Sequence, residues 1–77
     1  MKKRFIFTDH LKDQMARRHV TKLQVDVTVQ SPDCIAPDGM GLTGKKRRYI
    51  KEFRGRTLEV IVVEEDKKLI GLTCIWV

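Results

Sequence analysis

Basic and aromatic side chains are concentrated in one short stretch of this 77-residue chain, from Lys45 to Arg56. Seven residues of the stretch are Lys or Arg and one is acidic, and the whole chain carries a net charge of +6. Guanidinium groups bind phosphate through paired hydrogen bonds, and aromatic rings such as those of Tyr49 and Phe53 stack on unpaired bases. The stretch therefore predicts a surface that binds a polyanion, and single-stranded RNA or DNA is the class of polyanion that fits it. The predicted binding residues are Arg17, Lys45, Lys46, Arg47, Arg48 and Arg56.

The alternative for this stretch is a solvated edge strand that Lys and Arg protect against pairing with other chains. The seven Lys and Arg side chains within Lys45 to Arg56 exceed what edge protection needs, which favours binding of a polyanion.

His10 adds a side chain that exchanges protons near neutral pH. Metal-independent cleavage of RNA needs a base for the 2′-hydroxyl, cations for the phosphorane charge and an acid for the leaving oxygen. His10 or Glu52 would act as the base, Arg17 would help to stabilise charge, and Tyr49 would orient or donate. The candidate catalytic residues are His10, Tyr49, Lys51 and Arg54. The alternative for His10 is a structural side chain that bonds backbone near a helix start.

A strand and a helix are predicted at the start of the chain, where they would position His10. Residues 3–7 are rich in Phe and Ile, which suits a short strand. Thr8 can cap a helix whose Leu11 and Met15 lie on one face. We expect this helix to end near His19, which would serve as a C-terminal capping residue.

The segment 22–30 carries two conflicting signals. Leu23, Val25, Val27 and Val29 alternate with polar residues, as in a strand. Thr21 and Gln24 match a capping box, and Pro32 is a suitable stop for a helix. We predict a second helix, with a strand as the alternative.

The second half of the chain is predicted to be a meander of strands. A loop is expected at 37–44 and a bulge near Gly71. The strands are predicted at 34–36, 47–53, 58–64 and 69–77. The order is β-α-α-(β)-β-β-β, an α+β fold with two N-terminal helices packed on one face of a mainly antiparallel sheet of three to five strands. The other face of such a sheet can stay partly open to solvent or a ligand.

Length and composition predict one domain spanning 1–77, without a membrane span. The charged start is followed by too few apolar residues for a signal peptide, so we expect a cytoplasmic protein. Cys34 and Cys74 lack the spacing of a zinc site, and buried reduced thiols are favoured over a disulfide. No metal or cofactor is expected.

Short motifs spread over residues 5–75 resemble a family of small prokaryotic domains with an F-T-x-H-x4-M-x2-R start. The matching residues are Phe7-Thr8-Asp9-His10, Met15, Arg18-His19-Val20-Thr21, Ser31-Pro32-Asp33, Arg48-Tyr49 and the strand 58–63. That family is similar to the RelE and BrnT type II toxins, whose compact α+β fold serves as a ribosome-dependent or free ribonuclease. The resemblance implies a RelE-like fold, RNA as the substrate and an antitoxin protein as a partner. It also places the family's helix histidine and arginine at His10 and Arg18, and its basic-aromatic strand at Arg48 and Tyr49.

Three functions stay open from the sequence. The first is an RNA-directed, RelE/BrnT-like toxin with metal-independent ribonuclease activity, and the second is a non-catalytic nucleic-acid-binding module. The third is a protein–protein interaction domain whose sheet edge is covered by a partner or by a second copy in a homodimer. RelE-like toxins generally keep catalytic groups on their last strands, often a Tyr, His or Arg, whereas this chain has none of these residues after Lys68.

Overall fold

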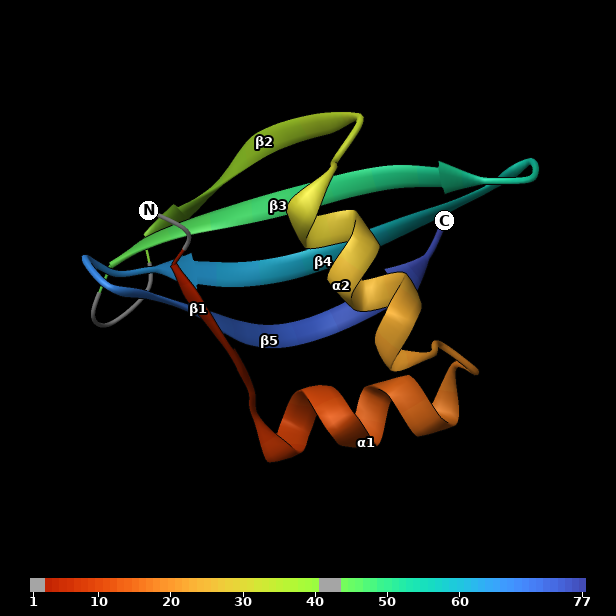
Figure 1. The fold of residues 1–77 in the computed structure, drawn as a ribbon, viewed down its shortest axis with the longest axis horizontal. Coiled ribbons are helices and arrows are strands. Elements are labelled where there is room, and N and C mark those ends of the chain that lie inside the picture. Colours follow the sequence, from red (N-terminus) through yellow and green to blue (C-terminus); the bar gives the residue numbers. More distant parts are fainter. Residues whose placement is uncertain (1–2, 41–43) are drawn as a thin grey trace.

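The first strand leads directly into the first helix at Thr8. The computed structural model describes residues 3–40 and 44–77, with β1 (Arg4–Phe7) followed by α1 (Asp9–Arg17) (Figure 1). The Thr8 hydroxyl accepts a hydrogen bond from the backbone N–H of Leu11 at 3.1 Å, which caps α1 as predicted. His19 follows α1 with a left-handed φ of 55°, and the next N–H bonds back to the carbonyl of Met15. This geometry closes many helices, so His19 has the predicted capping role.

The segment 22–30 is helical. In α2 (Lys22–Gln30) the Thr21 hydroxyl accepts from the Gln24 N–H at 3.1 Å, and the Gln24 side chain accepts from the Thr21 N–H at 2.9 Å. This reciprocal cap satisfies two backbone donors that a helix start leaves free. The prediction of a second helix is confirmed, and Val25 and Thr28 are its buried residues.

Five strands form one mixed sheet in the order β1-β5-β4-β3-β2. The remaining strands are β2 (Cys34–Met40), β3 (Lys45–Phe53), β4 (Arg56–Glu64) and β5 (Lys68–Trp76). β1 pairs parallel to β5, and all other pairs are antiparallel. The α+β class with two helices beside a sheet is confirmed. None of the helices in the described ranges is long and apolar enough to span a membrane.

The second strand differs most from prediction. β2 continues to Met40, so the predicted loop at 37–44 is wrong in its first part, and residues 41–43 lie outside the described ranges. A proline lacks the N–H that a central strand needs, but β2 is an edge strand, and its register shifts between Pro37 and Met40.

The predicted bulge lies beside Gly71. Ile61 of β4 pairs with Thr73, whereas the next residue, Val62, pairs with Gly71. Leu72 is therefore the extra residue on β5, as in a β-bulge.

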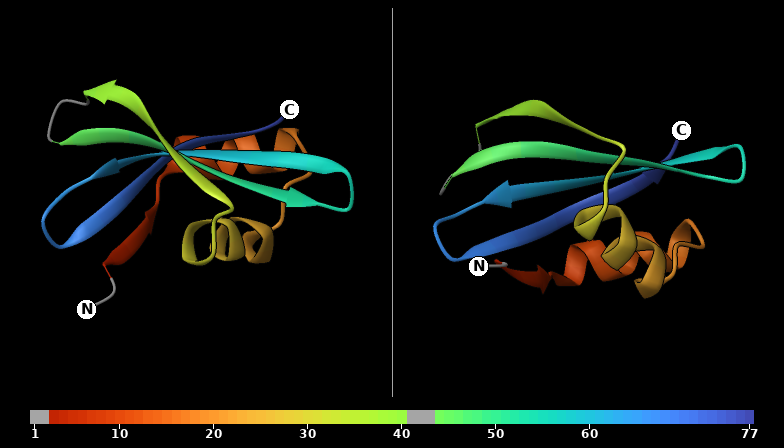
Figure 2. Two further views of the ribbon diagram at one scale, coloured as in Figure 1. Left: turned by 90° about the horizontal axis from the view of Figure 1, so that it is seen from above. Right: turned by 45° about the horizontal axis from the view of Figure 1, so that its top comes forward.

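Both helices cover the same face of the sheet (Figure 2). Leu58, Val60 and Val62 alternate along β4, are fully buried, and belong to one core with Leu11 of α1 and Val25 of α2. The chain's five aromatic residues belong to this core or pack against it: Phe5, Phe7, Tyr49, Phe53 and Trp76. Within the described ranges no helix crosses the opposite face, which is called the open face below (Figure 2).

Helix α1 is fixed to β5 at both of its ends. The Thr8 hydroxyl donates to the Gly71 carbonyl at 2.6 Å, and Arg18 Nη1 donates to the Cys74 carbonyl at 2.6 Å. Trp76 Nε1 donates in return to the Arg18 carbonyl at 2.9 Å. Between these ends Leu11 lies directly over Gly71, where a Cβ would meet Leu11 Cδ2 at 2.5 Å. Gly71 therefore sets how closely α1 packs on the sheet.

Gly71→Ala is expected to lower the free energy of unfolding by about 1–3 kcal/mol, because the new methyl group would displace α1. Urea unfolding at fixed pH measures this change. In a Leu11→Ala background the same substitution should cost less, since the nearest atom that the new methyl group would meet is gone and the clash with Phe5 Cζ at 2.7 Å remains. Equal costs in both backgrounds would contradict the close packing of Leu11 on Gly71.

Candidate nucleic-acid interface

The basic stretch does not form one continuous patch. Its residues make up β3, the following turn and the start of β4, and nine strand residues span roughly 30 Å. Because side chains alternate along a strand, the cations of β3 also divide between its two faces. Lys45, Arg47 and Lys51 lie on the helix-covered side, and Lys46 and Arg48 lie on the open face.

Carboxylates hold the cations of the open face. Arg48 Nη2 donates to Asp38 Oδ1 at 2.8 Å, and Arg48 Nη1 lies 3.4 Å from Glu59 Oε1. Lys46 Nζ lies 3.8 Å from the other oxygen of Asp38. The hydrogen bond from Arg48 lowers the pKa of Asp38, and the positive charges of Arg48 and Lys46 lower it further. Arg48 is thus largely neutralised within the fold.

Lys51, a predicted catalytic residue, anchors the connection between α2 and β2. Its Nζ donates to the Ser31 carbonyl at 2.8 Å and lies 3.6 Å from Asp33 Oδ1. Asp33 also accepts from the backbone N–H of Glu52 at 2.9 Å. Lys51 therefore has local partners that account for its position.

Tyr49 is buried beneath α2 and only 7% exposed. Burial raises the pKa of its phenol, the negative charge of Glu64 raises it further, and Arg47 opposes the shift. A ring in this place cannot stack on a base unless the core opens.

The candidate catalytic groups lie in different parts of the molecule. His10 is exposed in the first turn of α1, which lies along β5, whereas Tyr49 is on β3, with β4 in between (Figure 1). Arg54 occupies the β3–β4 turn with a left-handed φ of 48°, next to Gly55 at 83°. The structure brings none of these three side chains into a common site.

The remaining predicted binding residues also have intramolecular contacts. Arg17 Nε donates to Asp13 Oδ2 at 2.8 Å, one turn earlier on α1. The Arg56 guanidinium lies 4.1 Å from the ring centroid of Trp76, in a cation–π contact. These contacts place Arg17 and Arg56 away from the start of β3.

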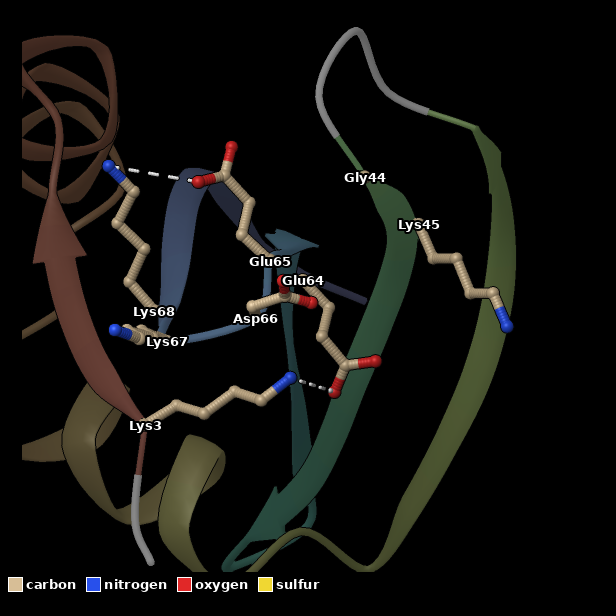
Figure 3. Close-up of a pocket in the computed structure, with 8 residues that line it drawn as sticks. All are labelled: Lys3, Gly44, Lys45, Glu64, Glu65, Asp66, Lys67 and Lys68. Carbon is tan, nitrogen blue, oxygen red and sulfur yellow. Dashed lines mark ion pairs between the residues drawn. The ribbon is translucent and has the colours of Figure 1, made fainter.

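Cations do gather at the end of the sheet where β3 begins, and this end has two open hollows. A hollow of about 890 Å³ is lined by Lys3 just before β1, by the start of β3 and by the β4–β5 turn with its flanking residues (Figure 3). Another of about 450 Å³ lies between β2 and β3, with Ile35 and Pro37 in its lining. Lys45 lines both hollows. The cations that line them, which are called the basic end below, are Lys3, Lys45, Lys46, Arg47, Lys67 and Lys68.

Glu64 organises part of the basic end. Its Oε2 lies 3.5 Å from Lys3 Nζ (Figure 3), and its Oε1 lies 3.0 Å from Arg47 Nε. One carboxylate of β4 thus contacts β3 and the residue that precedes β1. The side-chain Nε–H of Arg47 has no aligned acceptor within the described ranges, so its contact with Glu64 is an ion pair and not a hydrogen bond.

Two lysines of the basic end are not neutralised in this way. Lys68 Nζ lies 3.7 Å from Glu65 Oε1, but neither Lys45 nor Lys67 has an ion-pair partner among residues 3–40 and 44–77. Lys45 points away from the carboxylates of the turn and toward β2 (Figure 3). Six cations against the four carboxylates Asp38, Glu64, Glu65 and Asp66 leave this end with a net positive charge.

Lys3, Lys67 and Lys68 were not predicted to belong to this surface. Lys67 and Lys68 lie in the last third of the chain, which is acidic on average, and Lys3 lies far from the basic stretch in sequence. The register supplies the missing signal. β3 and β4 are antiparallel strands of nine residues, so the turn after β4 must return to the start of β3, where Lys45 pairs with Glu64.

The thiols also differ from prediction in part. Cys74 is buried and burial raises its pKa, whereas Cys34 is exposed on the edge strand β2. Both are free, so the expectation of a buried thiol is wrong for Cys34.

Comparison of the chain with models of protein families, with curated proteins and with solved structures finds no match. The resemblance to RelE- and BrnT-like toxins therefore stays a prediction.

Tyr49 is the only tyrosine in the chain, so its ionisation can be followed by tyrosinate absorbance. We expect a midpoint above the ordinary pKa of about 10 in the folded protein and a return to that value in concentrated urea. Because the folded pKa is raised, the stability that the neutral phenol contributes is full below about pH 10 and is lost as pH rises toward the folded value. A Tyr49→Phe variant should lack this loss. A folded midpoint at or below the ordinary value would contradict the burial of Tyr49.

Proposed function

We propose that this chain binds single-stranded RNA through phosphate contacts at the basic end, without cleaving it. The observation that carries the proposal is the place of Lys45, which lies between the two hollows without a carboxylate partner in the described ranges. Phosphate contacts with Lys and Arg supply most of the affinity in binding without sequence preference.

The other cations support Lys45 at this place. Lys67 provides a second side chain without an ion pair in the described residues, and Lys46 and Arg47 lie next to Lys45 on the strand. Ile35 is 45% exposed and gives the smaller hollow an apolar wall, against which a sugar or base can pack. A backbone phosphate at Lys45 would thus have room on either side.

RNA is the polyanion that we propose because of the resemblance to RelE- and BrnT-like toxins, a fold relationship that the β-α-α-β-β-β-β order allows. Binding without cleavage is favoured by the separation of His10 from Tyr49 and Arg54. A general base must lie within hydrogen-bond reach of the proton that it takes, together with the cations that stabilise the reacting phosphate.

The test is a binding titration of a fluorescent single-stranded RNA across a salt series, read beside a cleavage gel. The logarithm of the binding constant should fall linearly with the logarithm of salt concentration. Lys45→Ala/Lys67→Ala should reduce the magnitude of this slope by about 1.4, because each lost phosphate contact contributes about 0.7 for a single strand. The RNA should remain intact with all variants.

The matched control is Lys12→Ala/Arg54→Ala, which removes the same charge from α1 and from the β3–β4 turn. Its slope should equal that of the unaltered chain. If the two double variants reduced the salt slope by the same amount, the basic end would be rejected as the binding site. Cleavage that disappears in His10→Ala would reject binding without catalysis.

Asp38→Asn provides a gain of binding at the same site. Asp38 neutralises Lys46, so its replacement should tighten RNA binding and steepen the salt slope by about 0.7, or one phosphate contact. Weaker binding by Asp38→Asn, measured in the same titration on a protein of unchanged circular dichroism, would count against the contribution of Lys46.

A further inference from the structure

The open face of the sheet is aliphatic over three neighbouring strands. Cross-strand partners share a face, so the register places isoleucines and valines side by side there. One row crosses the sheet from Ile6 through Ile70 to Val63, and Ile61 and Ile75 lie in the next rows. Ile75 is 40% exposed, Ile6, Ile61 and Ile70 are half-buried, and Val63 is only 6% exposed. No helix in the described ranges packs on this face.

This face is poorly suited to a nucleic acid. The five aromatic residues belong to the covered side, so it offers no ring for base stacking. Its central cation, Arg48, is held between Asp38 and Glu59, and Lys46 also lies beside Asp38. The result is a nearly neutral cluster next to an aliphatic surface.

The edges of the sheet are poorly suited to pairing with another strand. β1 has only four residues, and β2 contains Pro37 and a register shift. Short strands, proline and irregular register are common means by which edges avoid pairing. A partner is therefore expected on the face of the sheet and not at its edge.

We infer that the open face is the interface of a homodimer, in which two copies pack their sheets face to face. The five strands contain 38 residues, which at a rise of about 3.3 Å and a strand spacing of about 4.8 Å present about 600 Å² per copy. The total of about 1,200 Å² reaches the lower limit for specific interfaces. Stacked sheets interdigitate their inner side chains, and homodimer interfaces are the more apolar class.

A second copy fits this face better than a polyanion or a strongly charged protein does. The same patch meets itself in a two-fold dimer, so a net charge on it would be repelled. The pairing of Arg48 and Lys46 with Asp38 and Glu59 removes that obstacle. Lys46 is shared by the two surfaces, because it pairs with Val63 at the end of an aliphatic row and also lines the hollow beside Ile35 and Pro37. Lys45 lies on the helix-covered side and Lys67 in the β4–β5 turn, so each copy would keep these two cations for RNA.

Sedimentation equilibrium over a range of protein concentrations tests this inference. The chain should approach twice its 9.0 kDa mass, and Ile61→Lys and Ile75→Lys should each return it to the monomer mass. Ile75→Lys is the safer variant, since its side chain is already 40% exposed in the single chain and the substitution leaves the core intact. Circular dichroism should report unchanged secondary structure in both variants.

Leu23→Lys is the matched control, because Leu23 is an exposed leucine on α2 (71%) and lies away from the open face. It should remain dimeric. A monomer at the highest soluble concentration of the unaltered chain would overturn the inference, as would a dimer that Ile61→Lys and Ile75→Lys leave intact. The RNA titration described above is a separate readout, so either proposal can fail without the other.

Discussion

The docking of α1 on β5 holds the first helix against the sheet. Thr8 both caps the helix and bonds to Gly71, Arg18 bonds to the carbonyl of Cys74, and Leu11 packs on the bare backbone of Gly71. Thr8 and Arg18 belong to the motif that suggested a toxin-like family. In this structure their contacts serve docking, and His10 between them is free at the surface. The motif thus explains the fold more directly than it explains a reaction.

The helix starts and the bulge could be predicted because each depends on residues that are close together in the sequence. The caps at Thr8 and Thr21 gave the helix starts, and Gly71 indicated the bulge on β5. The length of β2 was not predictable in the same way, because Pro37 is tolerated only on an edge strand, and strand order is a property of the whole sheet.

The site was harder to predict than the fold for the same reason. A run of cations is contiguous in sequence, but strand geometry divides it between two faces and two ends. The partners that neutralise Arg48 and Lys51 come from β2, β4 and the connection before β2. Lys67 joins Lys45 only through the register of the β3–β4–β5 meander. What remains for a ligand is Lys45 with its neighbours, a smaller surface than the sequence suggested.

Both helices cover the same face of the sheet, which leaves the other face available. We propose that RNA binds at the basic end and that a second copy of the chain packs on the open face. The most direct test of RNA binding at the basic end is to follow the backbone amide resonances of the isotope-labelled protein as single-stranded RNA is added at low salt. The largest shifts are expected at residues 44–47 and at Lys67 and Lys68. Largest shifts at His10 and Arg54 instead, with the start of β3 unchanged, would contradict it.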